Sequence, residues 1–177
     1  MKTFFSCVAI LLFVSFSQAQ YFTLTPNGFV ADNKNDFAVV EIPGVKQDEL
    51  YKNVLNAINT IYSNPQNGLN VVSGESISLS ATQTKAIKSS AGIMTYDYDI
   101  DYTLSFLFKD GKIRINSPKF EAYMQNYNGT WNTLNIKKAY FKNNGEIKSE
   151  KNYKQINDFF NNLIKRVLDK SSEINKW

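Results

Sequence analysis

The stretch YDYDIDYTLSFLF, residues 96–108, decides the fold class of this 177-residue chain. Its large apolar and aromatic side chains occupy every second position: Tyr96, Tyr98, Ile100, Tyr102, Leu104, Phe106 and Phe108. Aspartate, threonine and serine fill the positions between Tyr96 and Phe106. Only a β-strand, whose alternate side chains point to opposite faces, separates the two sets. The stretch therefore predicts a long strand with one buried face, in a register fixed by the cost of burying aspartates.

The chain turns immediately after this strand. Asp110-Gly111 is the pair favoured in two-residue type I′ hairpins. Such a turn places Phe108 opposite Ile113, so a second strand continues the apolar face. The sequence therefore predicts an antiparallel hairpin at the centre of the sheet.

Weaker patterns on both sides of this hairpin predict the remaining elements. Apolar residues at steps of three and four predict helices over 47–62 and 153–168. Strands are expected over 37–42, 71–72, 75–81, 120–124 and 134–140, and a loop over 85–92. A sheet with one polar face accepts helices on its other face only. The expected fold is α+β, a single antiparallel sheet with two helices on its aromatic face, in the order β-α-β-β-β-β-α.

The N-terminus has the composition of a secretory signal peptide. Lys2 precedes an apolar run over residues 4–16, and small residues at 17 and 19 suit a cut after Ala19. We therefore expect a signal peptide over 1–19 and one domain over 20–177, exported to the periplasm or outside the cell. The only cysteine, Cys7, lies before the cut, so the mature chain would form no disulfide.

Composition excludes several classes of chemistry. The chain has 20 Lys+Arg, 16 Asp+Glu and no histidine. Without histidine there is no Ser-His-Asp or Cys-His nucleophile, and zinc, haem and iron–sulfur sites lack their usual ligands. We therefore expect no catalytic residues, no metal and no cofactor, and carboxylate chemistry is the enzymatic alternative that survives.

Short motifs in the first two-thirds of the chain carry a family resemblance. They are Asn27-Gly28-Phe29-Val30, Glu41-Ile42-Pro43-Gly44, Asp48-Glu49-Leu50-Tyr51, Asn64-Pro65 and Lys109-Asp110-Gly111-Lys112-Ile113-Arg114. Together they resemble domain-of-unknown-function family 4468, an uncharacterised family of exported bacterial proteins with a fold like that of the TATA-binding protein. The resemblance covers a core of about 27–115, before a variable segment over 120–151. It implies fold and export but no activity, and a fold does not by itself imply DNA binding.

Three groups of side chains are candidate sites. Asp97, Asp99 and Asp101 share one face of the long strand, where we interpret them as a solvated acidic cluster. Calcium binding and glycoside hydrolysis are the alternatives for such carboxylates. Tyr123, Tyr127 and Trp131 lie in an irregular segment and are the candidate binding residues. Six lysines between Lys137 and Lys154, interleaved with aromatic residues, resemble a nucleic-acid footprint, but Glu146 and Glu150 dilute them.

These observations lead to three hypotheses for function. The first is a non-catalytic binding or interaction module of the bacterial cell envelope, whose partner is an envelope protein or small ligand and not nucleic acid. The second is a carboxylate-dependent hydrolase of envelope glycans. The third is a structural subunit of an envelope assembly, because a sheet with one free face can be covered by a partner. The sequence does not determine the oligomeric state.

Overall fold

A computed structural model describes residues 20–91, 94–125 and 128–173. Its main sheet has seven strands in the order β3-β7-β6-β5-β4, with β8 beside β6 and β9 beside β8, all antiparallel. The bounds are β3 Phe37–Glu41, β4 Leu69–Val72, β5 Ser76–Ala91, β6 Met94–Lys109, β7 Lys112–Asn116, β8 Lys119–Gln125 and β9 Trp131–Thr133. A separate hairpin joins β1 (Thr23–Thr25) to β2 (Gly28–Val30).

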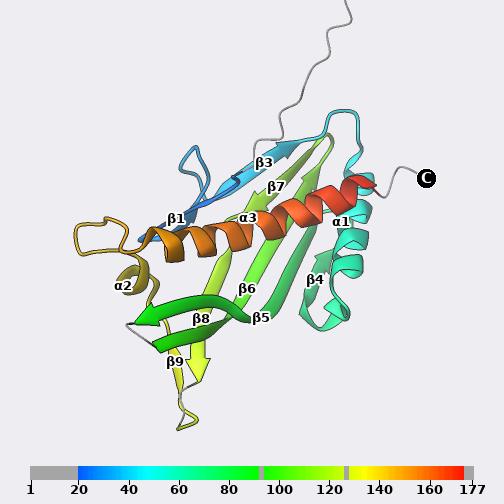
Figure 1. The fold of residues 1–177 in the computed structure, drawn as a ribbon. Helices are drawn as coiled ribbons and strands as arrows, with labels where there is room; N and C mark the ends of the chain where they lie inside the picture. The colour runs from blue at the N-terminus through cyan, green and yellow to red at the C-terminus, as the bar shows by residue number, and fades with distance from the viewer. Residues whose placement is uncertain (1–19, 92–93, 126–127, 174–177) are drawn as a thin grey trace, which may run out of the picture.

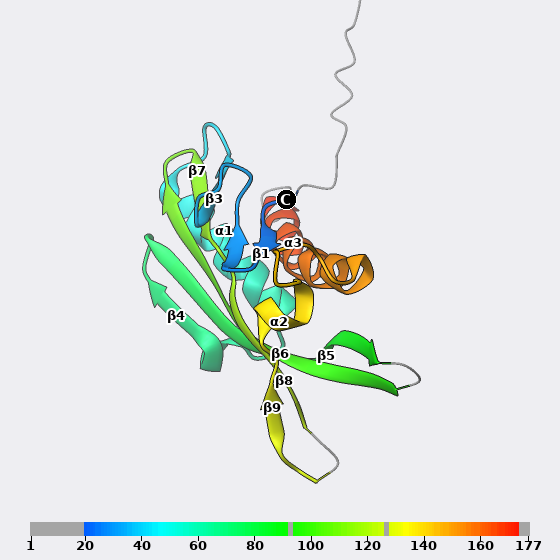
Figure 2. The same ribbon diagram turned by 90° about the vertical axis from the view of Figure 1, so that its left-hand side faces the viewer.

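The two long helices cover one face of this sheet. They are α1 (Gln47–Ile61) and α3 (Glu150–Glu173), and Figures 1 and 2 show both on the same side. Two short helices each connect a long helix to a strand: η1 (Pro65–Gly68) lies between α1 and β4, and α2 (Ile136–Tyr140) lies between β9 and α3. The predicted α+β fold class with two helices on one face is confirmed, with more strands than expected. Among the helices of the described residues, none combines the length and apolar composition that crossing a bilayer requires.

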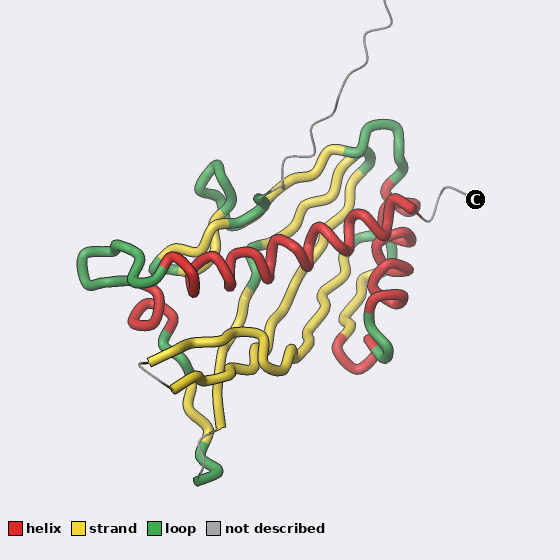
Figure 3. The backbone as a smooth tube through the Cα atoms, in the orientation of Figure 1, coloured by secondary structure: helices red, strands yellow, loops and turns green. Residues whose placement is uncertain are grey.

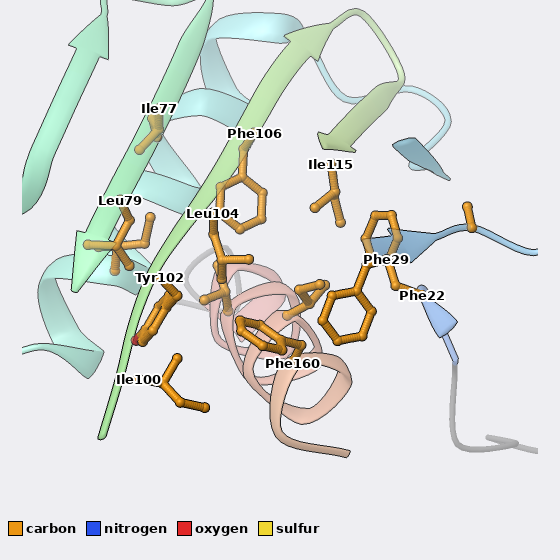
Figure 4. Packing of buried hydrophobic residues seen from close by; sticks show 14 of the residues in the cluster. Phe22, Phe29, Ile77, Leu79, Ile100, Tyr102, Leu104, Phe106, Ile115 and Phe160 are labelled. Atoms are coloured by element: carbon orange, nitrogen blue, oxygen red, sulfur yellow. The ribbon is translucent and has the colours of Figure 1, made fainter. Parts of the chain in front are cut away.

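The core lies between the helices and the inner face of the sheet. Five of the seven alternate residues of β6 predicted to be buried do enter it: Ile100, Tyr102, Leu104, Phe106 and Phe108 are at most 6% exposed. The other two, Tyr96 and Tyr98, are only partly buried. Figure 4 shows Ile100, Tyr102, Leu104 and Phe106 on the side of β6 that faces Phe160 of α3. The Phe160 ring packs against Phe29, with centroids 5.0 Å apart. Apolar burial on this scale is the main force that stabilises the fold.

The partners of β6 change along its length. One edge pairs with β5 from Met94 to Leu107, whereas the other edge pairs with β8 over Asp99–Thr103 and with β7 over Phe106–Lys109. In Figures 2 and 3 the lower parts of β5 and β6 turn away from β8 and β9. The outer face of the sheet, opposite the helices, therefore has two ends. At one end β6 pairs with β8, and at the other it pairs with β7.

The expected loop over 85–92 is wrong, because β5 continues to Ala91. The register shifts between Gln83 and Ile87, which pair with Ile100 and Tyr98. Lys85, with φ of 51°, lies in this bulge. Such an irregularity interrupts the alternation by which a strand is recognised, although Ile87 is buried beyond it. Gln155 of α3 bonds to the backbone here and holds the extension.

The expected strand over 134–140 is also wrong. Strand β9 ends at Thr133, and Ile136–Tyr140 form α2. The Asn135 side chain accepts a hydrogen bond from the backbone N–H of Lys138, at 2.9 Å. Asparagine is a strong N-cap residue, and its cap starts a helix where the apolar pattern alone suggested a strand.

The central hairpin forms in the predicted register, with Lys109 opposite Lys112, but its turn is not type I′. Gly111 has φ of 74°, whereas Asp110 is not among the described residues with positive φ, and type I′ requires positive φ at both. The Asp110 carboxylate accepts a hydrogen bond from the backbone N–H of Gln47 at 2.9 Å. The turn therefore caps the start of α1, which has no cap from its own Lys46 side chain.

The last helix holds the first strand through side chains. Asn161 Oδ1 accepts from the backbone N–H groups of Tyr21 and Phe22, at 2.6 and 3.0 Å, and its Nδ2 donates to the Phe22 carbonyl. One turn earlier, Asn157 accepts from the backbone N–H of Leu24, at 2.8 Å. These amides satisfy buried backbone groups that no neighbouring strand pairs. The predicted helix over 153–168 is thus longer than expected, at Glu150–Glu173, and binds the N-terminal hairpin.

Candidate functional site

The outer face of the sheet carries a ladder of hydroxyl groups. Across β5 and β6, Ser78 bonds to Ser105 at 2.8 Å between oxygens, and Ser80 bonds to Thr103 at 3.0 Å. The same alternation that fills the core forces these polar residues outward, because their neighbours on β6 point inward. The ladder continues toward the acidic cluster, where Thr82 lies opposite Asp101.

A hollow of about 560 Å³ opens at this end of the outer face. We call it the hydroxyl hollow; its polar lining residues are Asn67, Ser80, Thr82, Asp101, Thr103, Lys119 and Glu121. Its rim approaches β5 closely at Gly68, where a Cβ atom would lie 2.0 Å from the Ser80 carbonyl oxygen. Only glycine fits there, so Gly68 allows η1 to pack directly against the backbone of β5.

Asp101 connects the hollow to an aromatic pair. Its Oδ1 accepts hydrogen bonds from the Thr82 hydroxyl at 2.5 Å and from the Tyr123 hydroxyl at 2.9 Å. The bond to this carboxylate raises the pKa of Tyr123, because ionising the phenol would remove the donated proton. The carboxylate therefore fixes the position of the Tyr123 ring.

Tyr123 in turn supports an exposed indole. The rings of Tyr123 and Trp131 meet edge to face, with centroids 5.2 Å apart and planes at 73°. Trp131 is 55% exposed. Two of the three aromatic residues predicted for binding are thus adjacent. They lie beside the acidic cluster, a proximity that the sequence did not indicate. The third, Tyr127, lies outside the described residues.

The acidic cluster does not converge on a point. Asp99 accepts a hydrogen bond from the backbone N–H of Lys85 at 2.8 Å, whereas Asp101 bonds to Thr82 and Tyr123. Asp97 lies opposite Lys88 on β5. The described residues contain no group of three or more His, Cys, Asp or Glu side chains that could hold a metal ion. The three carboxylates therefore bond to separate partners and do not converge as calcium ligands do.

Two of the aromatic residues interleaved with the basic tract are turned into the core. Tyr140 and Phe141 are buried, at 3% and 5% exposure. Lys142 pairs with Glu146 at 2.9 Å, and Lys154 pairs with Asp158 at 2.5 Å. Base stacking requires exposed rings, which these two positions do not supply.

Sequence reasoning missed most of the hollow. Glu121 and Lys119 enter it because β8 pairs with β6 in a register that sets Glu121 opposite Asp101. Asn67 enters from η1, through the close approach at Gly68. The alternation of Ser80 and Thr82 with apolar residues was a usable signal for the outer face, but nothing local indicated which strands would meet there.

Comparison with known proteins confirms the fold. Residues 37–123 match the model of a family described as a domain of unknown function (DUF4468) with TBP-like fold, compared with the predicted range of 27–115. A DUF4468 family protein from Bacteroides ovatus ATCC 8483 has a TM-score of 0.55 at 14% identity, covering 76% of this chain and 84% of its own. A TBP-like protein from Parabacteroides distasonis ATCC 8503 has a TM-score of 0.53 at 18% identity, covering 77% and 90%. At this identity the likeness shows the fold alone, and no curated protein matches the chain.

Proposed function

With residues 37–123 identified as a DUF4468 domain with a TBP-like fold, we propose that the protein is a non-catalytic binding module of the bacterial cell envelope. Its ligand is a polyhydroxylated molecule of the glycan class, which occupies the hydroxyl hollow and extends over Trp131. The composition of residues 1–19, typical of a secretory signal peptide, supports placement in the envelope.

One observation carries the proposal: the chain of contacts from Thr82 through Asp101 and Tyr123 to Trp131. An indole with 55% exposure is normally free to change rotamer, but here its neighbour is anchored by a carboxylate. An aromatic ring held in place binds at a lower entropic cost than a mobile one. The contact with this anchored ring therefore favours one orientation of the exposed indole before any ligand arrives.

The lining of the hollow suits a sugar. Hydroxyl, carboxylate and amide side chains donate to and accept from sugar hydroxyls, and an aromatic face packs on the apolar face of a sugar ring. Ser80, Thr103 and Asn67 supply the neutral groups, while Asp101 and Glu121 supply acceptors. Such a combination of an aromatic platform and a few placed polar groups is typical of small-molecule sites.

Fluorescence tests this proposal directly, because the chain has only two tryptophans. In a mature Trp177→Phe protein, Trp131 is the only indole, and its emission reports on the aromatic pair that Asp101 connects to the hollow. Titration with chitotetraose, cellotetraose and maltotetraose, and sedimentation with peptidoglycan sacculi, should find a glycan that shifts the emission and binds. Asp101→Asn should weaken that binding about tenfold, the effect of one charge-assisted hydrogen bond.

A matched variant separates binding from general damage. Asp158→Asn removes an exposed carboxylate that pairs with Lys154 on α3, away from the outer face, and should leave glycan binding unchanged. A mature protein that binds none of these glycans, or binds them equally after Asp101→Asn and Trp131→Ala, would contradict the proposed site.

Hydrolysis of envelope glycans is the second candidate. Asp101 and Glu121 are directly opposite across β6 and β8, and both line the hydroxyl hollow. Directly opposed residues have Cβ atoms about 5 Å apart, compatible with a carboxylate pair of a glycosidase. Release of reducing sugars that is lost in both Asp101→Asn and Glu121→Gln proteins would establish this activity and replace the non-catalytic proposal.

A further inference from the structure

The other end of the outer face carries a second and different surface. Strands β3, β7 and β6 bring together Phe37, Val39, Arg114, Leu107 and Lys109, which we call the arginine strip. We propose that the arginine strip binds an acidic peptide segment of a partner protein, in which carboxylates alternate with apolar side chains. This surface shares no residue with the hydroxyl hollow.

The guanidinium of Arg114 is oriented by two contacts before any carboxylate binds. Its Cζ atom lies 4.0 Å from the centroid of the Phe37 ring, and its Nε donates to Asn116 Oδ1 at 3.0 Å. Stacking and the Nε bond fix the plane of the guanidinium and leave its terminal N–H groups free. No carboxylate of the described residues forms an ion pair with it. A guanidinium held in this way forms bidentate bonds to a carboxylate with little further loss of entropy.

Apolar side chains flank this cation on both neighbouring strands. Val39 pairs with Arg114 across β3 and β7, and Leu107 pairs with Arg114 across β7 and β6. Val39 is 46% exposed and Leu107 is 36% exposed. Both line a hollow of about 530 Å³ together with Arg114. Removing such neighbouring apolar area from water favours association, which a purely ionic patch would not offer.

The charge of this end identifies the partner as acidic. Lys109, Lys112 and Arg114 line the same hollow, and of these Lys112 alone pairs with a carboxylate, Glu41, at 3.5 Å. Glu75 is the single acidic residue of the lining. The opposite end of the same face carries Asp99, Asp101 and Glu121, which would repel a long polyanion such as nucleic acid. A short acidic peptide with apolar side chains can bind the arginine strip without reaching these carboxylates.

The probe is a fluorescein-labelled eight-residue peptide of alternating Glu and Val, titrated into the mature protein and followed by fluorescence anisotropy. We expect saturable binding that weakens as salt is added. Arg114→Gln should weaken it at least tenfold, about the effect of losing one bidentate charge pair. Arg114→Lys should also weaken it, because lysine lacks the planar fork. Val39→Ser should weaken it about threefold or more through lost apolar contact.

Controls make each outcome decisive. Arg166→Gln changes an exposed arginine of α3 on the helix side and should leave peptide binding unchanged, and circular dichroism confirms that each variant folds. A peptide of alternating Lys and Val should not bind. Equal binding by wild type and Arg114→Gln, equal losses in Arg114→Gln and Arg166→Gln, or no binding to wild type at millimolar peptide would overturn the proposal. So would a wild-type dimer that Arg114→Gln converts to a monomer, because the strip would then bind a second copy.

Discussion

The two faces of β6 differ more than any other two regions of the molecule. Its inner residues from Ile100 to Phe108 are almost wholly buried, whereas its outer residues from Asp99 to Leu107 form hydrogen bonds to neighbouring strands or remain exposed. Adjacent residues thus serve different purposes, since one set stabilises the fold and the other is available to partners. Stability and binding can therefore be altered separately on a single strand.

The largest difference in stability is expected between substitutions of two neighbours that lie on opposite faces of β6. Phe106→Ala removes a fully buried ring and should lower the free energy of unfolding by about 3–5 kcal/mol, the usual cost of a large cavity. Leu107→Ala, one residue on, truncates an exposed side chain and should cost below about 1 kcal/mol. Urea unfolding followed by circular dichroism measures both. Similar losses in the two proteins would mean that the outer face also carries the fold.

Asn161 and Asn162 of α3 are a second pair of neighbours of which one is buried and the other is exposed. Asn161→Ala leaves the buried N–H groups of Tyr21 and Phe22 without an acceptor and should cost about 1–3 kcal/mol. Asn162→Ala changes an exposed residue and should be neutral or slightly stabilising, because alanine favours helix. Thermal and urea denaturation of both proteins measure the difference. If Asn161→Ala were as stable as wild type, the side-chain hold on the first strand would be unimportant.

Removing the hydroxyl group of Tyr102 and that of Tyr140 should change the stability of the fold in opposite directions. The Tyr102 and Tyr62 hydroxyls bond to each other at 2.9 Å, whereas the buried Tyr140 hydroxyl has no partner among the described residues. Tyr140→Phe should therefore stabilise by up to about 1 kcal/mol, and Tyr102→Phe should destabilise by about 1 kcal/mol. Denaturation midpoints of the two variants and of wild type, measured side by side, test this expectation, and a loss of stability in Tyr140→Phe would contradict it.

The smallest expected effect concerns an exposed carboxylate. The backbone N–H of Gln47, and then Lys46, lower the pKa of Asp110 below its ordinary value of 3.8. A lowered pKa means that the folded state binds fewer protons, so this contribution is complete above pH 3.8 and is lost as pH falls through the folded value. Stability measured from pH 6 to pH 2 should fall slightly less steeply in Asp110→Asn than in wild type. Parallel curves would show that the cap contributes nothing.

The sequence could predict the elements whose patterns are uninterrupted. Alternation along β6 gave its register and buried face, and the apolar spacing gave α1 to within one residue of its end. Prediction failed where a single residue overrides a pattern: Lys85 in the bulge, Asn135 at a helix start and Asp110 at a turn. The candidate site was predicted as two unrelated groups, because the Asp101–Tyr123 bond depends on strand pairing that is not local.

The hydrogen bonds between α3 and the residues that precede β1 have a consequence for the order of folding. Asn161 contacts Tyr21 and Phe22 across separations of 140 and 139 residues, nearly the whole domain. Closing so long a loop is slow, and contacts of high sequence separation are expected late in folding. Tyr21 and Phe22 therefore cannot make these contacts until Asn161 has been synthesised, 140 and 139 residues later. Until then Phe22 and Phe29 have no core to enter, and the nascent chain presents both rings to any chaperone that binds exposed aromatic side chains.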